Sequence, residues 1–164
     1  MKNKIIHSNL FVILLAFLFL IGCSPAKKIA PLQQGDAFKL VDQHQFTFVA
    51  DNVSPFRGRT RYLTSDYSIT VNKDSLVSYL PFFGQATQAP MNPSETGIKF
   101  TSTDFSYKVV QTKNDRKEVT VVPNDRNDIQ QLYFIIYDNG SATLHVTSTY
   151  RDPISFNGHL SRVK

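Results

Sequence analysis

The chain has 164 residues, of which 41% are hydrophobic and 19% are charged, and its formal net charge is +5. This length and hydrophobic share fit one globular domain with a substantial core. The charge is too small to indicate nucleic-acid binding, which usually requires a strongly basic patch or stripe. Because Cys23 is the only cysteine, an internal disulfide is excluded. We therefore expect a domain held by packing and backbone pairing alone.

The first residues have the parts of a secretory signal. Two lysines precede an apolar stretch, residues 10–21, that runs into Leu20-Ile21-Gly22-Cys23. A basic start, an apolar stretch and small residues before the cleavage site are typical of exported proteins. A cysteine directly after the small residue is the mark of a bacterial lipoprotein. We predict cleavage between Gly22 and Cys23 and attachment of a diacylglyceryl group, with palmitate-type chains, to the Cys23 thiol.

The alternative for the apolar stretch is a transmembrane helix, but twelve residues are fewer than the roughly 20 that a span needs. Removal of residues 1–22, with two lysines and no acid, lowers the net charge from +5 to +3. Residues 23–32 contain two prolines and two lysines, a composition that favours an extended, solvated tether. We expect a signal peptide at 1–22, a lipidated tether at 23–32 and a single β domain at 33–164.

Residues 33–43 are compatible with a short amphipathic helix. From Gln45 onward, apolar and polar residues alternate, which predicts antiparallel strands with one face on a core. The alternation is clearest at residues 46–48, 67–71, 105–109 and 119–121. Residues 133–137 are apolar at every position, which predicts a central strand covered on both faces.

Turn residues separate these predicted strands. Asn139-Gly140 predicts a two-residue hairpin in which both residues adopt positive φ. Residues 72–74 and 113–117 separate other strand pairs, and residues 85–96 form a long irregular stretch that favours a solvent loop over a functional one. We expect eight to ten strands in an all-β, mainly antiparallel domain, either a meander-type β-sandwich or a partly open barrel.

Three arginines are the first binding candidates. Arg57, Arg59 and Arg61 alternate with small residues, so in an extended chain their guanidinium groups project to one side. Such groups bind phosphate or carboxylate in a bidentate manner, and anionic lipid, lipopolysaccharide phosphate or peptidoglycan carboxylate are partners found in a cell envelope. The favoured alternative is a charged edge strand that prevents aggregation.

Aromatic side chains supply a second group of candidates. Tyr79, Phe82 and Phe83 lie on either side of Leu80-Pro81, where they would form a binding platform for a sugar or peptide, although core packing is the favoured interpretation. Tyr150 and Arg151 either form a stacked binding pair or are structural, with Arg151 holding a turn.

Catalytic and metal-binding patterns are missing from the sequence. The four histidines have no metal-ligand spacing, and nucleophile elbows and phosphate-binding glycine loops are absent. We therefore expect no metal, no cofactor and no catalytic residue. Scattered carboxylates leave open a glycosidase pair, so a hydrolase acting on an envelope glycan is the least favoured alternative.

The segment Leu80-Pro81-Phe82-Phe83-Gly84-Gln85-Ala86 resembles the LPYFG-x-A segment of a family of Bacteroidota envelope proteins, domain of unknown function 4251 (DUF4251). Residues 97–100 are similar to its next segment, and residues 139–158 are similar to its ending. The similarity covers about residues 43–160. This resemblance implies a small exported lipoprotein and supplies no catalytic residue.

The resemblance also bears on location, because surface-exposed lipoproteins of that phylum tend to carry acids just after the cysteine. Residues 24–28 contain none, which implies the periplasmic face of the outer membrane. We expect a lipid-anchored, non-catalytic module that binds or scaffolds an envelope protein, glycan or lipid, and no nucleic acid. The alternative is a carrier that holds a small apolar ligand in a β cup or barrel. The sequence does not determine the oligomeric state.

Overall fold

The computed structural model describes residues 32–33, 35–88 and 96–163. These residues belong to one compact unit, Pro31–Lys164, whereas the predicted cleavage and lipidation site, Gly22 and Cys23, lies outside the described residues. No helix within the described ranges has both the length and the apolar character needed to cross a membrane.

The described residues form one short helix and ten strands, which confirms the all-β prediction. The helix is α2 (Asp36–Asp42), and the strands are β1 (Phe46–Pro55), β2 (Arg61–Tyr62), β3 (Ser68–Val71), β4 (Leu76–Leu80), β5 (Ile98–Ser102), β6 (Phe105–Lys113), β7 (Arg116–Pro123), β8 (Ile129–Tyr137), β9 (Ser141–Ser148) and β10 (Ile154–Ser161). The helix lies within the predicted range of residues 33–43.

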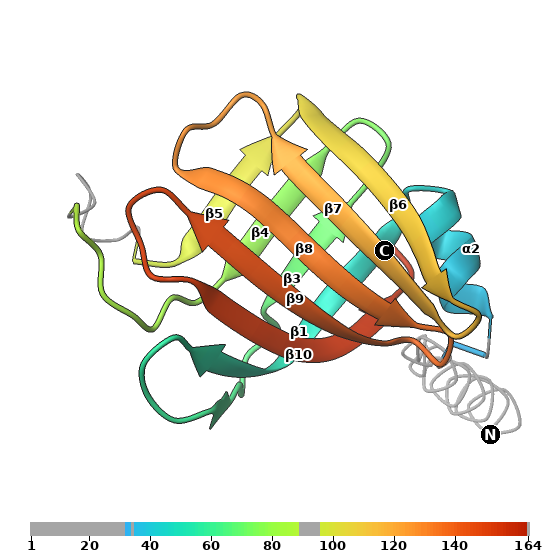
Figure 1. Cartoon of the computed structure of the whole chain (residues 1–164), viewed down its shortest axis with the longest axis horizontal. Helices are drawn as coiled ribbons and strands as arrows, with labels where there is room; N and C mark the ends of the chain where they lie inside the picture. The colour runs from blue at the N-terminus through green and yellow to red at the C-terminus, as the bar shows by residue number, and fades with distance from the viewer. Residues whose placement is uncertain (1–31, 34, 89–95, 164) are drawn as a thin grey trace, which may run out of the picture. The chain divides into compact units, whose positions relative to one another are not determined.

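All ten strands belong to one antiparallel sheet that curls into a half-barrel (Figure 1). Its order is β5-β4-β3-β1-β10-β9-β8-β7-β6, with β2 paired to β1 off this path. Most neighbours are hairpins, but β1 pairs with β10 and so joins the first and last parts of the chain. The two edge strands, β5 and β6, follow each other in the sequence. The arrangement is the predicted meander, closed far enough to enclose a core.

The inner face of the curled sheet is filled with large apolar side chains. Phe134 of β8 contacts Phe46 and Phe48 of β1 edge-on, with ring centroids 5.7 and 5.9 Å apart. All three rings have an exposed fraction of 0%, so none borders a void large enough for a water molecule. The contact across the two sides of the half-barrel is therefore a packed core, held together by apolar burial.

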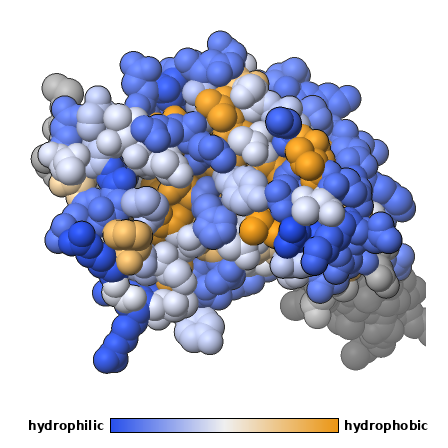
Figure 2. Space-filling view, in the orientation of Figure 1, coloured by the Kyte–Doolittle hydropathy of each residue, from blue (hydrophilic) through white to orange (hydrophobic). Residues whose placement is uncertain are grey.

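The outer face of β8 differs from the prediction. Residues 133 and 135 are only half-buried, so this strand is covered on one face and not on both. Tyr133 stacks on its cross-strand neighbour His145, with centroids 6.0 Å apart, and its interaction with Glu118 raises the pKa of its hydroxyl. The surface over these strands is mostly hydrophilic, with separate hydrophobic patches (Figure 2).

The β8–β9 turn contains three residues instead of the predicted two. Gly140 has φ +88°, whereas Asn139 is not among the residues with positive φ. The N–H of Gly140 donates to the carbonyl of Tyr137 at 3.0 Å, which makes a turn followed by a left-handed residue, the usual three-residue hairpin. The asparagine side chain instead accepts the N–H of Ser141 at 2.9 Å.

Helix α2 lies at the end of the sheet that contains the β6–β7 and β8–β9 turns, here called the helix end (Figure 1). Val41 is fully buried, and its carbonyl accepts the Tyr107 hydroxyl at 2.9 Å. Burial, and then the charge of Asp42, raise the pKa of Tyr107, which keeps this donor protonated. Lys117 Nζ lies 2.6 Å from Asp42 Oδ1 and fixes the end of the helix.

Candidate functional site

The opposite end of the sheet, here called the loop end, contains the loops 56–60, 81–97, 124–128 and 149–153. Hydrogen bonds connect the last three of these loops in series. The Thr149 side chain donates to the carbonyl of Asn127 at 2.6 Å. The N–H of Thr87 donates to the carbonyl of Tyr150 at 2.8 Å, and the N–H of Asp152 donates to the carbonyl of Gln85 at 3.0 Å. The segment 80–86 and the residues 150–152 therefore meet in space.

Arg151 adds two further contacts between these loops. Its guanidinium group lies over the Phe82 ring, 5.2 Å from the centroid, and Nη1 donates to the carbonyl of Gly97 at 2.8 Å. A planar guanidinium group suits this combination of stacking and hydrogen bonding better than an ammonium group does. Arg151 thus contacts both ends of the β4–β5 connection, at Phe82 and at Gly97.

The other aromatic candidates separate into two groups. Phe82 and Phe83 are half-buried and pack against the core, in line with the packing interpretation. Tyr79 does not pack in the core as the favoured interpretation predicted, because 48% of the residue is exposed on the outer face of β4. Its ring stacks on Tyr67, with centroids 5.7 Å apart. Tyr150 is also exposed, at 43%, and contributes its backbone carbonyl to the loop contacts.

The three arginines come together in a way the sequence did not predict. They are not on one extended strand, because the chain leaves β1 at Pro55, bends through residues 56–58 and returns as β2 at Arg61. Gly58, with φ +128°, lies in this bend. The hairpin nevertheless places all three arginines on one cavity of about 330 Å³. The other chemically distinctive lining residues are Phe83, Gln85 and Asp152.

The cavity carries more positive than negative charge, because three arginines and one carboxylate, Asp152, line it. Arg57, Arg59 and Arg61 are exposed, and none forms an ion pair with a carboxylate within the described ranges. Arg61 lies over the Phe83 ring, 5.1 Å from its centroid, which restricts its orientation. Free guanidinium groups around a concavity are suited to bidentate binding of carboxylate or phosphate oxygens.

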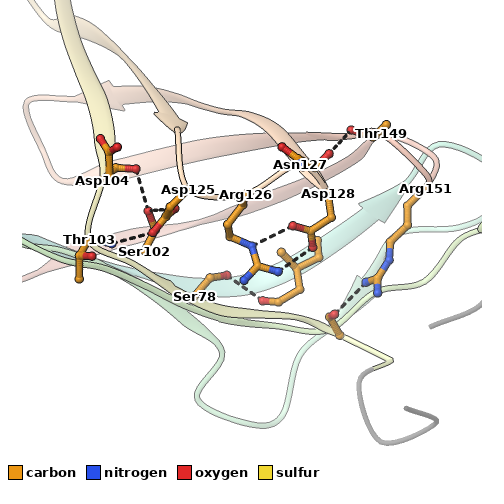
Figure 3. Close-up of polar contacts among 12 residues, drawn as sticks. Ser78, Ser102, Thr103, Asp104, Asp125, Arg126, Asn127, Asp128, Thr149 and Arg151 are labelled. Carbon is orange, nitrogen blue, oxygen red and sulfur yellow. Dashed lines mark hydrogen bonds and ion pairs between the residues drawn. The ribbon is translucent and has the colours of Figure 1, made fainter. Parts of the chain in front are cut away.

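A second polar cluster at the loop end was not singled out from the sequence (Figure 3). Asp125 accepts the Ser102 hydroxyl at 2.6 Å and the N–H of Thr103 at 3.1 Å, and the first of these bonds lowers its pKa. Arg126 binds both oxygens of Asp128, at 2.8 and 2.9 Å. These partners are engaged with one another, so the cluster connects the β7–β8 loop to the corner between β5 and β6. In the sequence, the run of polar residues at 124–128 was the pattern that could have indicated this cluster.

The described carboxyl groups whose pKa is shifted give no support to acid catalysis. Among the described carboxyl groups with a perturbed pKa, all three are lowered: Glu118, Asp125 and Asp128. A glycosidase acid requires a raised pKa. No three metal-ligating side chains within the described ranges are grouped to hold an ion. Within the described residues, the arginine cavity is a feature suited to binding.

Comparison with known proteins identifies the family. The sequence profile of the domain of unknown function DUF4251 matches residues 32–160. The crystal structure of a DUF4251 family protein from Bacteroides eggerthii DSM 20697 is similar in fold, with a TM-score of 0.56 and 17% identity over 77% of this chain and 85% of that chain. No curated protein matches the chain. The chain therefore belongs to the DUF4251 family.

Proposed function

We propose that this protein is a lipid-anchored module of a bacterial cell envelope that binds an anionic group of a partner, without catalysis, in the arginine cavity. One observation carries this proposal: three guanidinium groups without ion-pair partners among the described residues line one concavity. The family, with the export signal and Cys23 in the sequence, supports the envelope setting. The carrier alternative gains no support, because the central ring cluster borders no void.

The position of the cavity supports a partner beyond the anchoring surface. The chain enters the domain at the helix end, where the N–H of Gly35 donates to the carbonyl of Asp138 at 3.0 Å. The cavity lies at the loop end, and the eight residues of β10 that connect the two ends span roughly 26 Å. A domain tethered through residues 23–32 on the periplasmic face of the outer membrane would be able to present this cavity to a periplasmic polymer or protein.

The test uses the full-length protein in mild detergent and purified peptidoglycan as a carboxylate-bearing polymer. The triple variant Arg57→Gln, Arg59→Gln, Arg61→Gln removes the site. The triple variant Lys73→Gln, Lys108→Gln, Lys113→Gln removes the same charge from exposed positions elsewhere. We expect at least a tenfold loss of affinity in the arginine variant, about 1.4 kcal/mol, and little change in the lysine variant. Equal losses would show that net charge alone causes binding.

The anchor is tested separately in cells. Cys23→Ala should release the protein from the membrane fraction or leave it as an uncleaved precursor, because the thiol is the proposed site of lipid attachment. Gly22→Ala is the matched control, since alanine is also small enough to precede the cleavage site. A processed, membrane-bound form of Cys23→Ala would contradict the anchor.

A further inference from the structure

The arginine cavity contains one group that works against the binding of a simple anion. Asp152 lines the same cavity as the three arginines yet forms no ion pair with any of them. A carboxylate in an anion site repels the ligand it is meant to hold. The presence of Asp152 therefore indicates that the ligand also has a group that a carboxylate can bind, unless the fold itself needs this charge.

The fold has limited need for this carboxylate. The backbone already joins the two loops, through the bridge between Ala86 and Arg151 and the bond from the N–H of Asp152 to Gln85. The side chain adds one long contact, in which Oδ2 accepts the N–H of Gln85 at 3.3 Å. Its second oxygen has no hydrogen-bond partner among the described residues. That oxygen is available to a ligand.

We infer that the cavity takes an acidic peptide group with a free amino group. The arginines bind its carboxylates, and the Asp152 carboxylate binds its ammonium group, which turns a repulsive neighbour into a charge-assisted partner. The Phe83 ring provides an apolar wall. A cavity of about 330 Å³ is at the small end of ligand sites, which suits one or two residues. This inference rests on the proposed anion-binding function.

Other anions fit these groups less well. Inorganic phosphate and the phosphate of a lipid without an amine, such as phosphatidylglycerol, bring negative charge with no cation for Asp152. A uronic acid offers hydroxyl donors, which are weaker partners for a carboxylate than an ammonium group. The ammonium group is therefore the feature that distinguishes the inferred ligand from other acidic molecules.

The experiment compares two peptides that differ only in this group. The dipeptide alanyl-glutamate and its N-acetyl form are titrated by calorimetry into the full-length protein in detergent at pH 6.5, where an α-amino group is protonated. General attraction to the arginines favours the acetylated peptide, which is the more negative of the two. We expect the opposite order, with the free amine binding about tenfold more tightly.

The variant Asp152→Asn keeps an oxygen that accepts the N–H of Gln85 but removes the charge. We expect it to lose the preference for the free amine, and to bind inorganic phosphate more tightly than the wild type. Asp74→Asn, an exposed position in the β3–β4 turn, should leave both affinities unchanged. If Asp152→Asn does not fold, the relative affinities of the wild-type protein for the two peptides are sufficient to test the inference.

The outcomes separate this inference from the proposed function. Tighter binding of the acetylated peptide, or binding of phosphate or glucuronate without either peptide, overturns the inference and leaves an anion site in place. Peptide affinities that the triple arginine variant does not change overturn both. A preference for the free amine that persists in Asp152→Asn also refutes the assigned role of Asp152.

Discussion

Gly158 lies where the two parts of the sheet are joined, and Gly158→Ala tests that junction. It pairs with Ala50 in the β1–β10 ladder, beside a register shift between Ala50 and Asn52. A Cβ atom at this position would lie 1.9 Å from the carbonyl oxygen of Val49, whereas ordinary contacts are 3.4–4 Å. The obstacle is backbone, so no side chain can rotate away. The two strands must move apart by more than 1 Å at this point.

The expected cost follows from the two interactions that this movement damages. Overpacking of a well-packed interior costs about 1–3 kcal/mol, and a ladder hydrogen bond contributes about 1 kcal/mol. Gly158→Ala should therefore lower the free energy of unfolding by about 3 kcal/mol. The loss is large against the 5–15 kcal/mol typical of natural domains.

The assay is urea unfolding followed by far-ultraviolet circular dichroism, because the chain has no tryptophan. Gly35→Ala is the control for a glycine replaced without a clash: Gly35 has positive φ, +82°, which Gly158 does not, and a Cβ atom added there would meet nothing within 4 Å. That variant should lose only about 1–2 kcal/mol, the cost of a left-handed residue. Equal stability of the two variants would refute the argument from close backbone approach.

Three further predictions concern the core, the loop cluster and the β8–β9 turn. Phe134→Ala should cost about 3–5 kcal/mol in urea unfolding, because the buried ring contacts two others across the half-barrel; a loss below about 1 kcal/mol would contradict the packed core. Burial raises the pKa of Asp128, but the hydrogen bond and charge of Arg126 outweigh it and lower the pKa. The stability that this lowered pKa provides is present above the unfolded-state value of about 3.9 and is lost as pH falls through the folded-state value. Asp128→Asn should therefore lower Tm at pH 7, with a difference that shrinks below about pH 4, and a pH-independent difference would count against the ion pair. Gly140→Val should cost about 1 kcal/mol or more, because Gly140 has positive φ, and an unchanged denaturant midpoint would exclude the turn described.

The sequence predicted what depends on local pattern. Alternating residues identified the strands, and the polar stretch around residues 33–43 contained the helix. Residues 139–140 located a turn but not its type, since the three-residue form depends on how Tyr137 and Gly140 pair. The aromatic and aliphatic residues of β8 suggested burial on both faces, although a sheet with a single inner side leaves Ile135 half-exposed.

The candidate site depended on contacts that no local pattern contains. Arg57, Arg59 and Arg61 were recognisable as anion-binding groups, but alternation suggested a strand, whereas a hairpin bend brings them together. Asp152 and Gln85 join the same cavity through pairing between loops that are far apart in the chain. Such long-range pairing follows from the sheet order, which hydrophobic periodicity does not determine.

The most direct test of the anion-binding cavity is native mass spectrometry of the full-length protein purified in detergent from the cells that produce it. The account predicts extra mass, beyond that of the proposed covalent lipid, that disappears on denaturation and in the variant carrying Arg57→Gln, Arg59→Gln and Arg61→Gln. The same extra mass retained by that variant would contradict the claim that these arginines hold the ligand.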